Sequence, residues 1–569
     1  RRDFIKKRDA GQVISLELIE GRELVKRAAA KATGPDREVM DTTLNRLAHG
    51  GEDGGRADDE LATRLLLSND LHIAMRRSGE RTNRSRYKSE LECFVDRTAA
   101  RYAAWYEVFP RSMSDNPNRH GTFDDVIKKL PYVRDMGFDV LYFTPIHPIG
   151  RTFRKGRNNT LNAGEGDVGS PYAIGSDEGG HDALHPELGS FEDFERLVKA
   201  AHSHGLEIAI DFAIQCSPDH PWIKQHPEWF DWRPDGTIKF AENPPKKYQD
   251  IYPLNFDNDP EGLAAEVLRV VELWIGHGVN IFRVDNPHTK PLWFWEWLIA
   301  RVRKNHPDTV FLAEAFTRPA MMQGLAKAGF QQSYSYFTWR NAKWELEEYL
   351  REISQETAGH YRPNFFVNTP DILTEYLQFG GPAAFKVRAA LAATASPLWG
   401  VYAGFELFEH VARPGAEEYM DNEKFQLRPR DFDAAVERGE SLAPYITRLN
   451  RIRKDHPALG DLQNLTLQNS TDDAIVAYSK TKTVERDGEQ VRDTVIVVLN
   501  TDPHSAREAT VWLDLDSLDL RDQDFNEDGS FWVDDLISGA SWKWGTHNYV
   551  RLDPYVEPVH VLSIRRDVK

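Results

Sequence analysis

The feature that most constrains the fold is a set of apolar stretches that each end on an acidic residue. The stretch Ile281–Asp285 ends this way, and so do Thr309–Glu314 and Phe365–Asp371. Arg283 and Asp285 are two residues apart, so on a strand their side chains point to the same side. Barrel enzymes place their chemistry where parallel strands run into loops. The pattern therefore predicts two-carboxylate glycosyl chemistry, with a third acid assisting.

Short apolar runs alternate with helix-like stretches from residue 104 onward, which is typical of parallel βα units. The predicted strands are Trp105–Phe109, Val140–Thr144, Glu207–Phe212, Val279–Asp285, Val310–Glu314, Gln332–Phe337, Phe365–Thr369 and Trp399–Ala403. Eight such units predict an α/β fold, a (β/α)8 TIM barrel, with insertions at 145–188 and 213–259. The second insertion follows the third strand. Loops this long are usually functional.

The pattern divides the chain into an N-terminal accessory region (1–98), a catalytic barrel (99–455) and a C-terminal β-sandwich (456–569). For the first region we predict a mostly helical structure, whose role would be packing or dimerisation. Its expected elements are a strand at Val13–Ile19, helices at Gly21–Ala32, Arg37–Leu47 and Asp58–Arg77, a breaker at Gly34-Pro35 and a loop at His49–Asp59.

Strands separated by turn residues predict the C-terminal sandwich. They are Ala474–Lys480, Thr494–Asn500, Ala509–Leu515, Phe531–Val533, Tyr549–Leu552 and Val559–Ile564. The stretch Asp524–Gly529 has calcium-loop spacing, but Asp535 stands where the closing Glu belongs, so we expect an acidic surface turn.

Composition narrows the class of partner. The chain of 569 residues carries a net charge of −18, which disfavours nucleic acid and anionic membranes as partners. It has no apolar run of about 18 residues and no signal-peptide pattern, so we expect no membrane span and a cytoplasmic location. The chain begins with Arg1 rather than Met, which leaves open that N-terminal sequence is missing.

Two cysteines cannot form a disulfide framework, and Cys216 is expected to be a packed thiol. The histidines show no metal-binding spacing, and no Gly-rich loop opens a helix after a strand. We therefore expect no metal, no cofactor and no nucleotide-sugar donor.

The strand-end motifs resemble the α-amylase family of glycoside hydrolases and transglycosylases. The resemblance runs from about residue 105 to the C-terminus and rests on Asp211–Cys216, Phe282–His288, Phe311–Glu314 and Phe366–Asp371. It implies a barrel, an added domain after the third strand and a C-terminal sandwich.

Within that family the chain is similar to the maltosyltransferases of the GlgE type, which use α-maltose 1-phosphate to extend α-1,4-glucans. The supporting stretches are His147–Asn159, Ala241–Asp250, Asn286–Lys290 and Ala313–Pro319. Gln215-Cys216 and Pro370 stand where ordinary amylases carry sugar-contacting histidines, which argues against plain starch hydrolysis. The N-terminal region is shorter than that of these maltosyltransferases, which usually begins with a β-sandwich.

The resemblance implies a role for each strand-end residue. Asp285 would be the nucleophile, and Glu314 the general acid and then the general base. Asp371 would bind ring hydroxyls and oppose the positive charge of the transition state. Arg283 would hold Asp285 ionised.

The resemblance also implies binding residues. The expected phosphate cradle is Asn243, Lys246, Tyr248 and Asn286. The residues expected to line the maltose pocket are Lys155, Asp182 and Gln215.

We therefore expect a retaining maltosyltransferase that acts on α-maltose 1-phosphate and an α-1,4-glucan acceptor, assembled as a homodimer. Two alternatives stay open. One is a hydrolase, phosphorylase or isomerase of the same family, and the other is a non-catalytic glucan-binding protein.

Overall fold

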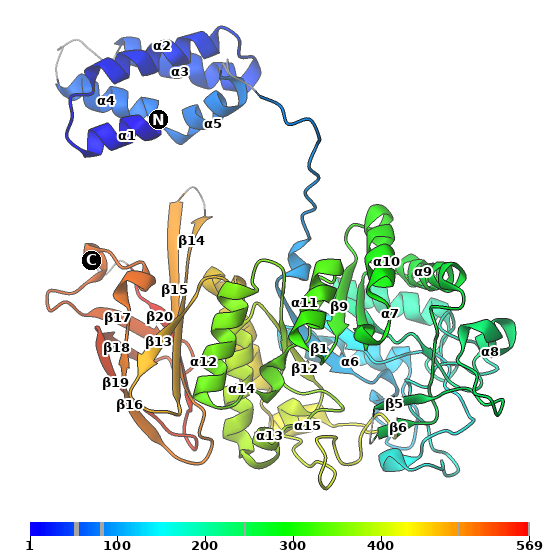
Figure 1. Cartoon of the computed structure of the whole chain (residues 1–569). Helices are drawn as coiled ribbons and strands as arrows, with labels where there is room; N and C mark the ends of the chain where they lie inside the picture. Colours follow the sequence, from blue (N-terminus) through cyan, green and yellow to red (C-terminus); the bar gives the residue numbers. More distant parts are fainter. Residues whose placement is uncertain (50–55, 80–84, 244–245, 487–488, 567–569) are drawn as a thin grey trace. The chain divides into compact units, whose positions relative to one another are not determined.

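The computed structural model describes residues 1–49, 56–79, 85–243, 246–486 and 489–566. The chain divides into two compact units, residues 1–94 and residues 95–569, whose elements are labelled in Figure 1. Finer domain limits at residues 98 and 455 stay a prediction.

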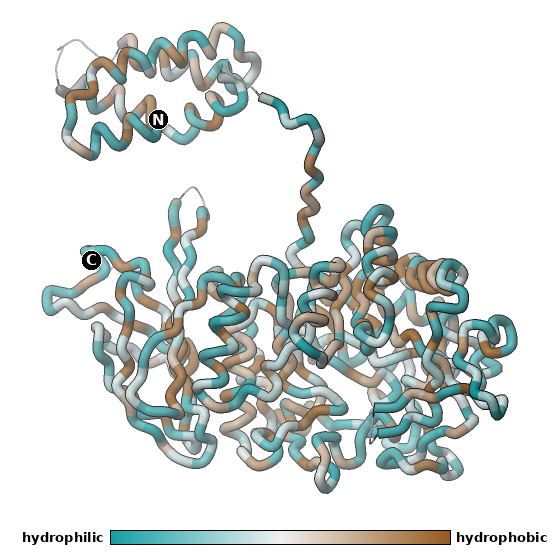
Figure 2. The backbone as a smooth tube through the Cα atoms, in the orientation of Figure 1, coloured by the Kyte–Doolittle hydropathy of each residue, from teal (hydrophilic) through white to brown (hydrophobic). Residues whose placement is uncertain are grey.

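The first unit is helical, as predicted. Its helices are α1 (Arg2–Asp9), α2 (Ser15–Ala29), α3 (Gly34–His49), α4 (Arg56–Leu66) and α5 (Asn69–Ser78). They pack around a small core that includes Val25, Met40 and Leu71. Apolar and polar residues alternate along these helices (Figure 2), as expected where one face of each helix is buried.

Three predicted details of this unit are wrong. The predicted strand at 13–19 is instead the approach to α2 and its first turns, because a lone strand has no partner for its backbone groups. Gly34-Pro35 starts a helix rather than breaking one, since proline is tolerated in the first helical turn. The helix predicted over 58–77 is two helices, and Ser68 caps the second. Of the predicted loop at 49–59, residues 50–55 lie outside the described residues, and α4 already begins at Arg56.

The second unit is built on the predicted barrel. Its strands are β1 (Ala103–Val108), β2 (Val140–Phe143), β3 (Glu207–Phe212), β8 (Ile281–Asp285), β9 (Val310–Glu314), β10 (Gln332–Ser333), β11 (Asn364–Phe366) and β12 (Leu398–Tyr402). All are parallel, in the order β10-β9-β8-β3-β2-β1-β12-β11. A parallel bridge between Ser333 and Pro363 brings the two ends together.

Helices cover the outside of this barrel (Figure 1). The longer ones are α6 (Phe123–Asp135), α7 (Phe191–Ser203), α9 (Pro260–Gly276), α10 (Leu292–Asn305), α11 (Pro319–Ala328), α12 (Lys343–Arg351), α14 (Gly381–Ala395) and α16 (Ala443–Asp455). The shorter ones are α8 (Pro221–Gln225), α13 (Glu375–Phe379) and α15 (Phe432–Glu437). Capping boxes at Thr122 and Ser190 start α6 and α7.

Two barrel strands end three or more residues earlier than predicted. β10 ends at Ser333, and the aromatic residues Tyr336–Trp339 form a 3-10 turn instead. β11 ends at Phe366, so Asp371 stands on a loop rather than at the last strand position. The insertion after β3 contains two small antiparallel strand pairs, β4 (Gln215–Cys216) with β7 (Tyr252–Pro253) and β5 (Ala241–Asn243) with β6 (Lys246–Tyr248).

The C-terminal part is the predicted antiparallel β domain. Its strands are β13 (Leu465–Ser470), β14 (Ile475–Arg486), β15 (Glu489–Asn500), β16 (Arg507–Trp512), β17 (Phe531–Asp535), β18 (Ser541–Trp544), β19 (His547–Leu552) and β20 (Val559–Ile564). The strands β13 and β18 were not predicted, because their sequences are more polar than those of the predicted strands.

Alternate side chains of β14 are buried on opposite faces of the sheet. Val476 and Tyr478 join the core shared with the barrel, whereas Ile475 and Ala477 join the inner core of the β domain. The β domain is therefore anchored on the barrel. The predicted acidic surface turn is only partly exposed, because Asp524 is buried against Arg492 and Arg566.

Among the described residues, no helix is both long enough and apolar enough to cross a membrane.

Candidate active site

Two acids from neighbouring strands meet on one arginine at the carboxyl ends of the barrel strands. Asp285 of β8 and Glu314 of β9 are paired in register, and neighbouring strands lie about 4.8 Å apart. Nη1 of Arg283 lies 2.9 Å from Asp285, and its Nη2 lies 3.6 Å from Glu314. Because one planar guanidinium contacts both carboxylates, the two acids face a common space.

A buried network holds Arg283 in place. Its Nη1 donates to both oxygens of Asp211 on β3, at 3.1 and 2.9 Å. The hydroxyls of Tyr142 and Tyr172 donate to Asp211 at 2.6 and 2.9 Å. Burial alone would favour the neutral guanidine, but Asp211 and the other neighbours outweigh it and raise the pKa of Arg283. Arg283 therefore stays a cation beside Asp285.

The two paired acids differ in their surroundings. Burial first, and then the nearby charge of Asp285, raise the pKa of Glu314 to about 7, although Arg283 opposes this rise. The backbone N–H of Asn286 donates to Glu314 at 3.1 Å. Asn286 has a φ of 44°, a left-handed conformation that asparagine tolerates better than most residues. Glu314 is thus poised to hold or release a proton near neutral pH.

A second cluster combines an acid with two lysines. Nζ of Lys424 lies 2.9 Å from Asp371, and Nζ of Lys246 lies 2.7 Å from Glu418. Partial burial raises the pKa of Asp371, but Lys424 and then Lys246 outweigh it and hold that pKa below its ordinary value. Glu418 also pairs with Arg413. These residues stand on loops and on β6, not on barrel strands.

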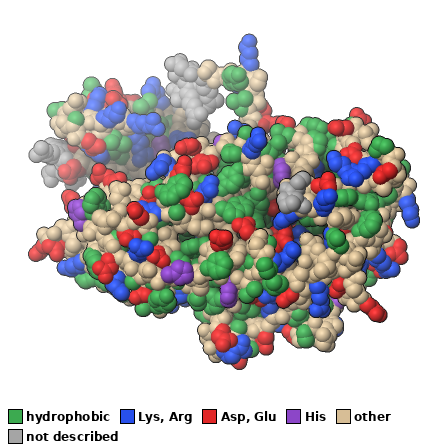
Figure 3. Space-filling view, turned by 60° about the horizontal axis from the view of Figure 1, so that its bottom comes forward, with side chains coloured by type: hydrophobic (Ala, Val, Ile, Leu, Met, Phe, Trp, Pro, Cys, Tyr) green, Lys and Arg blue, Asp and Glu red, His purple; other side chains and the backbone are tan. Residues whose placement is uncertain are grey.

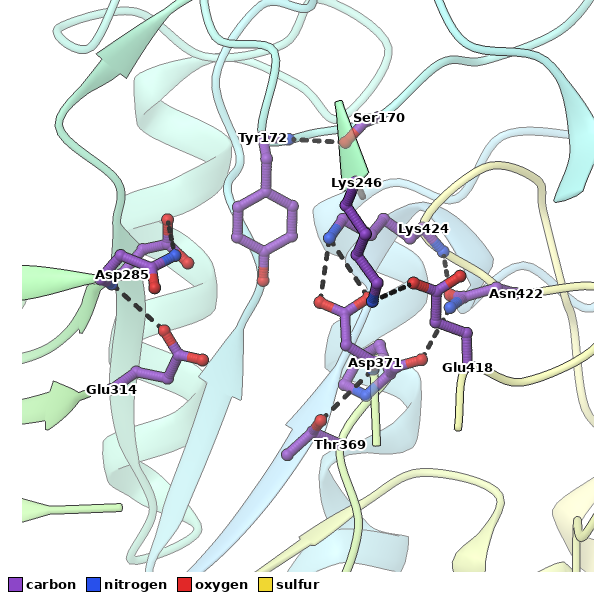
Figure 4. A network of polar contacts seen from close by, with 12 residues as sticks. Ser170, Tyr172, Lys246, Asp285, Glu314, Thr369, Asp371, Glu418, Asn422 and Lys424 are labelled. Carbon is purple, nitrogen blue, oxygen red and sulfur yellow. Dashed lines mark hydrogen bonds and ion pairs between the residues drawn. The ribbon is translucent and has the colours of Figure 1, made fainter. Parts of the chain in front are cut away.

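Tyr172 lies between the two clusters in the close-up view (Figure 4). Its hydroxyl reaches Asp211 under the first cluster, and Nζ of Lys424 lies 4.7 Å from the centre of its ring. Asp285 and Asp371 both act on the pKa of Lys424, so this amine stands within electrostatic reach of both acids. Figure 3 looks onto this side of the molecule, where acidic and basic side chains mingle around a recess.

A third lysine stands near the acid pair. Lys290 follows the 3-10 turn Pro287–Thr289, and its Nζ lies 3.5 Å from the carbonyl oxygen of Asn286. Burial lowers its pKa, and the charges of Asp285 and Glu314 oppose that change. Lys290 is therefore a second basic group, besides Arg283, within electrostatic reach of both acids.

The structure places most of the predicted binding residues around these clusters. Tyr248 is close enough to Lys424 and Lys246 for their charges to affect its pKa, and Asn243 pairs with Lys246 in the β5–β6 hairpin. Nε2 of Gln215 donates to the carbonyl oxygen of Tyr172 at 3.4 Å.

The other two predicted maltose-pocket residues differ in burial. Lys155 is buried and donates to Gln249 at 2.5 Å. Asp182 lies apart from the group, because its carboxylate is exposed and binds Arg269 of α9 at 2.7 Å.

Sequence reasoning missed Lys424, Glu418 and Tyr172 as site residues. All three stand on loops, where no strand periodicity marks a side chain as facing the barrel axis. The only available signal is the concentration of charged and aromatic residues in the long segments after β2 and β12.

One group of potential metal ligands, His181, Cys216 and His220, lies beside the site. Nδ1 of His181 contacts Nε2 of His220 at 3.0 Å, and Nε2 of His181 contacts the carbonyl oxygen of Ala213 at 2.8 Å. Trp222 N–H donates to Nδ1 of His220. Every ring nitrogen is engaged, and burial raises the pKa of the Cys216 thiol, so the trio fits a packed hydrogen-bonded cluster rather than a metal centre.

Solved structures with a similar fold include α-amylases. One is an α-amylase from Geobacillus thermoleovorans in complex with acarbose, with a TM-score of 0.61, 17% identity, and coverage of 82% of this chain and 99% of that one. Another is a maltogenic α-amylase from Thermotoga neapolitana, with a TM-score of 0.61, 18% identity, and coverage of 82% and 99%. The fold is therefore that of the α-amylases.

Sequence relatives narrow the class. The model described as alpha amylase, catalytic domain, matches residues 107–258, and the model for GLGE, C-terminal, matches 467–564. A third, for alpha-1,4-glucan:maltose-1-phosphate maltosyltransferase, domain N/S, matches 1–97.

The maltosyltransferase of that name from Mycolicibacterium smegmatis is 52% identical over 98% of this chain and 78% of its own length. Maltosyltransferase 2 of Streptomyces coelicolor is 53% identical over 98% and 81%. The chain belongs to the family of α-1,4-glucan:maltose-1-phosphate maltosyltransferases.

Proposed function

We propose that this enzyme transfers maltosyl units from α-maltose 1-phosphate to the non-reducing end of α-1,4-glucans and releases phosphate, with retention of configuration. The family supports the reaction, and the surroundings of Asp285 and Glu314 support the stereochemical course. Retaining enzymes of this class need two carboxyl groups about 5 Å apart. Paired positions on adjacent strands, joined by one guanidinium, suit that spacing.

In the first step, Asp285 attacks the anomeric carbon of the donor. The bond from that carbon to the phosphate oxygen breaks, Glu314 passes its proton to that oxygen, and a β-glycosyl ester forms on Asp285. Arg283 pairs with the attacking carboxylate and orients it before this step. Asp371 binds ring hydroxyls and opposes the positive charge that builds on the sugar.

In the second step, Glu314 removes the proton from the acceptor's hydroxyl, and that oxygen attacks the same carbon from the opposite face. The ester bond to Asp285 breaks, and its carboxylate is released. Two inversions give net retention. Once Asp285 is esterified, it no longer repels a second negative charge. The pKa of Glu314 should then fall, so that a larger fraction of this carboxyl group is ionised and able to take the proton.

The departing phosphate needs positive charge and hydrogen-bond donors. Lys246 supplies an ammonium group on the β5–β6 hairpin, with Asn243, Tyr248 and Asn286 as neighbouring donors. In the structure Lys246 is bound to the Glu418 carboxylate. A phosphate group is the kind of anion that can compete for it. Lys155 and Gln215 would line the maltose pocket.

The single observation that carries the proposal is the pairing of Asp285 and Glu314 opposite a wall that contains lysines. The test is phosphate release from α-maltose 1-phosphate. We expect release to depend on added glycogen, with products that lengthen in maltose steps and an α configuration in the new linkage. Free maltose as the main product would instead favour hydrolysis, and glucan binding without any turnover would favour a non-catalytic role.

We also propose a cytoplasmic homodimer. On the first unit, Val13, Leu16 and Ile19 are exposed at the start of α2 at 88%, 65% and 61%. A helix surface this apolar suits contact with a second copy. Sedimentation should give about twice the mass of one chain. The double variant Leu16→Glu, Ile19→Glu should sediment with the mass of a single chain.

A further inference from the structure

A group of side chains that can bind a metal ion, and that the proposed reaction does not use, lies between two loops of the barrel. His120 stands on the loop that leads from β1 to α6, and His185 and Glu187 stand on the segment that leads from β2 to α7. One ring nitrogen of each histidine and one carboxylate oxygen of Glu187 lie within 4.8 Å of one another. Ligand atoms on one tetrahedral zinc ion are about 3.3 Å apart. A small closing movement would therefore bring all three onto one ion.

Each of the two rings has a nitrogen lone pair that an ion can use. Nδ1 of His120 donates to the carbonyl oxygen of Gly121 at 2.8 Å, which leaves the lone pair on Nε2. A hydrogen bond of this kind orients the histidines of most metal sites. Nδ1 of His185 accepts only a long contact, 3.3 Å, from the backbone N–H of Glu187. An ion can displace so weak a donor.

A third histidine borders the same place. His120, His147 and His185 line a hollow of about 10 Å³, which is room for about one ion or one water molecule. His147 is 1% exposed, and its Nδ1 donates to the carbonyl oxygen of Ala183 at 3.0 Å. Its Nε2 has no hydrogen-bond partner among the described residues. A buried polar atom without a partner is costly, so the hollow suits a polar occupant.

The electrostatics of the group keep both rings neutral. Burial lowers the pKa of His120, and burial followed by the charges of His120 and Arg111 lowers the pKa of His185 to about 3. An ion therefore does not have to displace a proton from either ring. Arg111 opposes a cation, but its guanidinium donates to three backbone carbonyl oxygens, and the carboxylate of Glu187 acts against its charge.

We propose that His120, His185 and Glu187 bind a zinc ion, with water completing its coordination on the side of His147. Two neutral imidazoles and one carboxylate are a ligand set that zinc accepts. Glu187 is exposed, which gives an ion a path from solvent.

The role of such an ion would be structural. It would join the loop after β1 to the insertion after β2. Arg111 belongs to the first of these loops and donates to the backbone carbonyl oxygens of Glu423 and Lys424, so the ion would also steady the loop contacts on the lysine side of the catalytic recess. None of its ligands takes part in the proposed reaction, so the two proposals fail independently.

The test is calorimetric titration of the full chain with zinc chloride after dialysis against a chelator. We expect one equivalent to bind and to raise the melting temperature. Glu187→Gln should weaken the dissociation constant by about tenfold, and His120→Ala with His185→Ala by about 100-fold. His202→Ala is the matched control, because this exposed histidine of α7 lies outside the group. An unchanged melting temperature of each metal-free variant excludes a folding effect, and the exposed Glu187 tests the site even if the double variant fails to fold.

A second readout uses Co²⁺ in place of zinc, because its absorption spectrum reports the ligands. Nitrogen and oxygen ligands should give visible bands without a thiolate charge-transfer band. A thiolate band that disappears in Cys216→Ser would place the ion at the His181, Cys216 and His220 cluster and overturn the proposal. The absence of saturable zinc binding overturns it as well, and so does equal affinity in Glu187→Gln, the double variant and the control.

Discussion

The two sides of the catalytic recess are built in different ways. The acids Asp285 and Glu314 stand at the last positions of paired barrel strands and share Arg283. The lysines Lys246 and Lys424 stand on a small hairpin and on a long loop after β12. Backbone hydrogen bonds of a closed parallel sheet hold the acids, whereas side-chain ion pairs hold the lysines. The positions of the acids are therefore determined by the barrel, and the positions of the lysines by the loops.

This contrast suggests a division of labour. Strand positions cannot move without breaking the sheet, which suits covalent attack, where small displacements are costly. Loop lysines can exchange one anionic partner for another, which suits the arrival and release of a phosphorylated donor. Substitutions on the acid side should therefore abolish chemistry, and substitutions on the lysine side should mainly change donor binding.

The largest effect is expected from Asp285→Ala. Loss of the nucleophile should lower kcat by about 10⁴-fold or more, while calorimetry should still detect binding of α-maltose 1-phosphate. Asp182→Ala is the control, because that acid binds Arg269 on the outside of the barrel, and its kcat/KM should change by less than about twofold. Full activity in Asp285→Ala would remove the assignment of the nucleophile.

Glu314→Gln should come next, with a loss of about 10²- to 10⁴-fold in kcat. The loss should be greater for transfer to the acceptor than for reaction with the donor, because phosphate departs without full protonation. Single-turnover measurements of phosphate release separate the two steps. Equal losses in both would argue against a special role as base.

The pH dependence of the reaction tests the role of Glu314 further. The pKa of Glu314 in the free enzyme is raised to about 7, so the acid is protonated below that pH and ionised above it. The kcat/KM for the donor, which reports the free enzyme, should decline as pH rises through about 7, and the decline should be absent in Glu314→Gln. An identical decline in the variant would mean that another group causes it.

Lys424→Ala should have an intermediate effect, on the order of 10- to 100-fold in kcat/KM, because removing one partner leaves Asp371 without its main counter-charge. A double-mutant cycle tests the coupling. Asp371→Asn should cost less in the Lys424→Ala background than in the parent. Strictly additive losses would show that the pair does not act as a unit.

The smallest effect is expected from Lys246→Ala, because its side chain is 54% exposed. We expect KM for α-maltose 1-phosphate to rise about five- to tenfold, with little change in inhibition by maltose. Lys247→Ala is the matched control: it is the next residue, 60% exposed, and paired only loosely with Glu242 at 3.9 Å. A similar change in both variants would place the phosphate elsewhere.

The sequence alone determined the barrel and its acids. An apolar strand that ends on Asp285 or Glu314 can be recognised without a structure, because a buried strand requires a run of apolar residues. The side-chain period of two then indicates which residues point to the same side. The same pattern located the β domain. It failed at β10, where aromatic residues that look like a strand fold into a 3-10 turn, and at α2, where a short apolar run leads into the first turns of a helix.

Only the tertiary structure decided which loop residues reach the site. Lys424 is 53 residues from Asp371 in the chain and yet binds its carboxylate, whereas Asp182, expected in the pocket, faces Arg269 outside it. Loops lack the periodicity that ties sequence position to side-chain direction, so their contacts depend on the path that the folded barrel imposes on them.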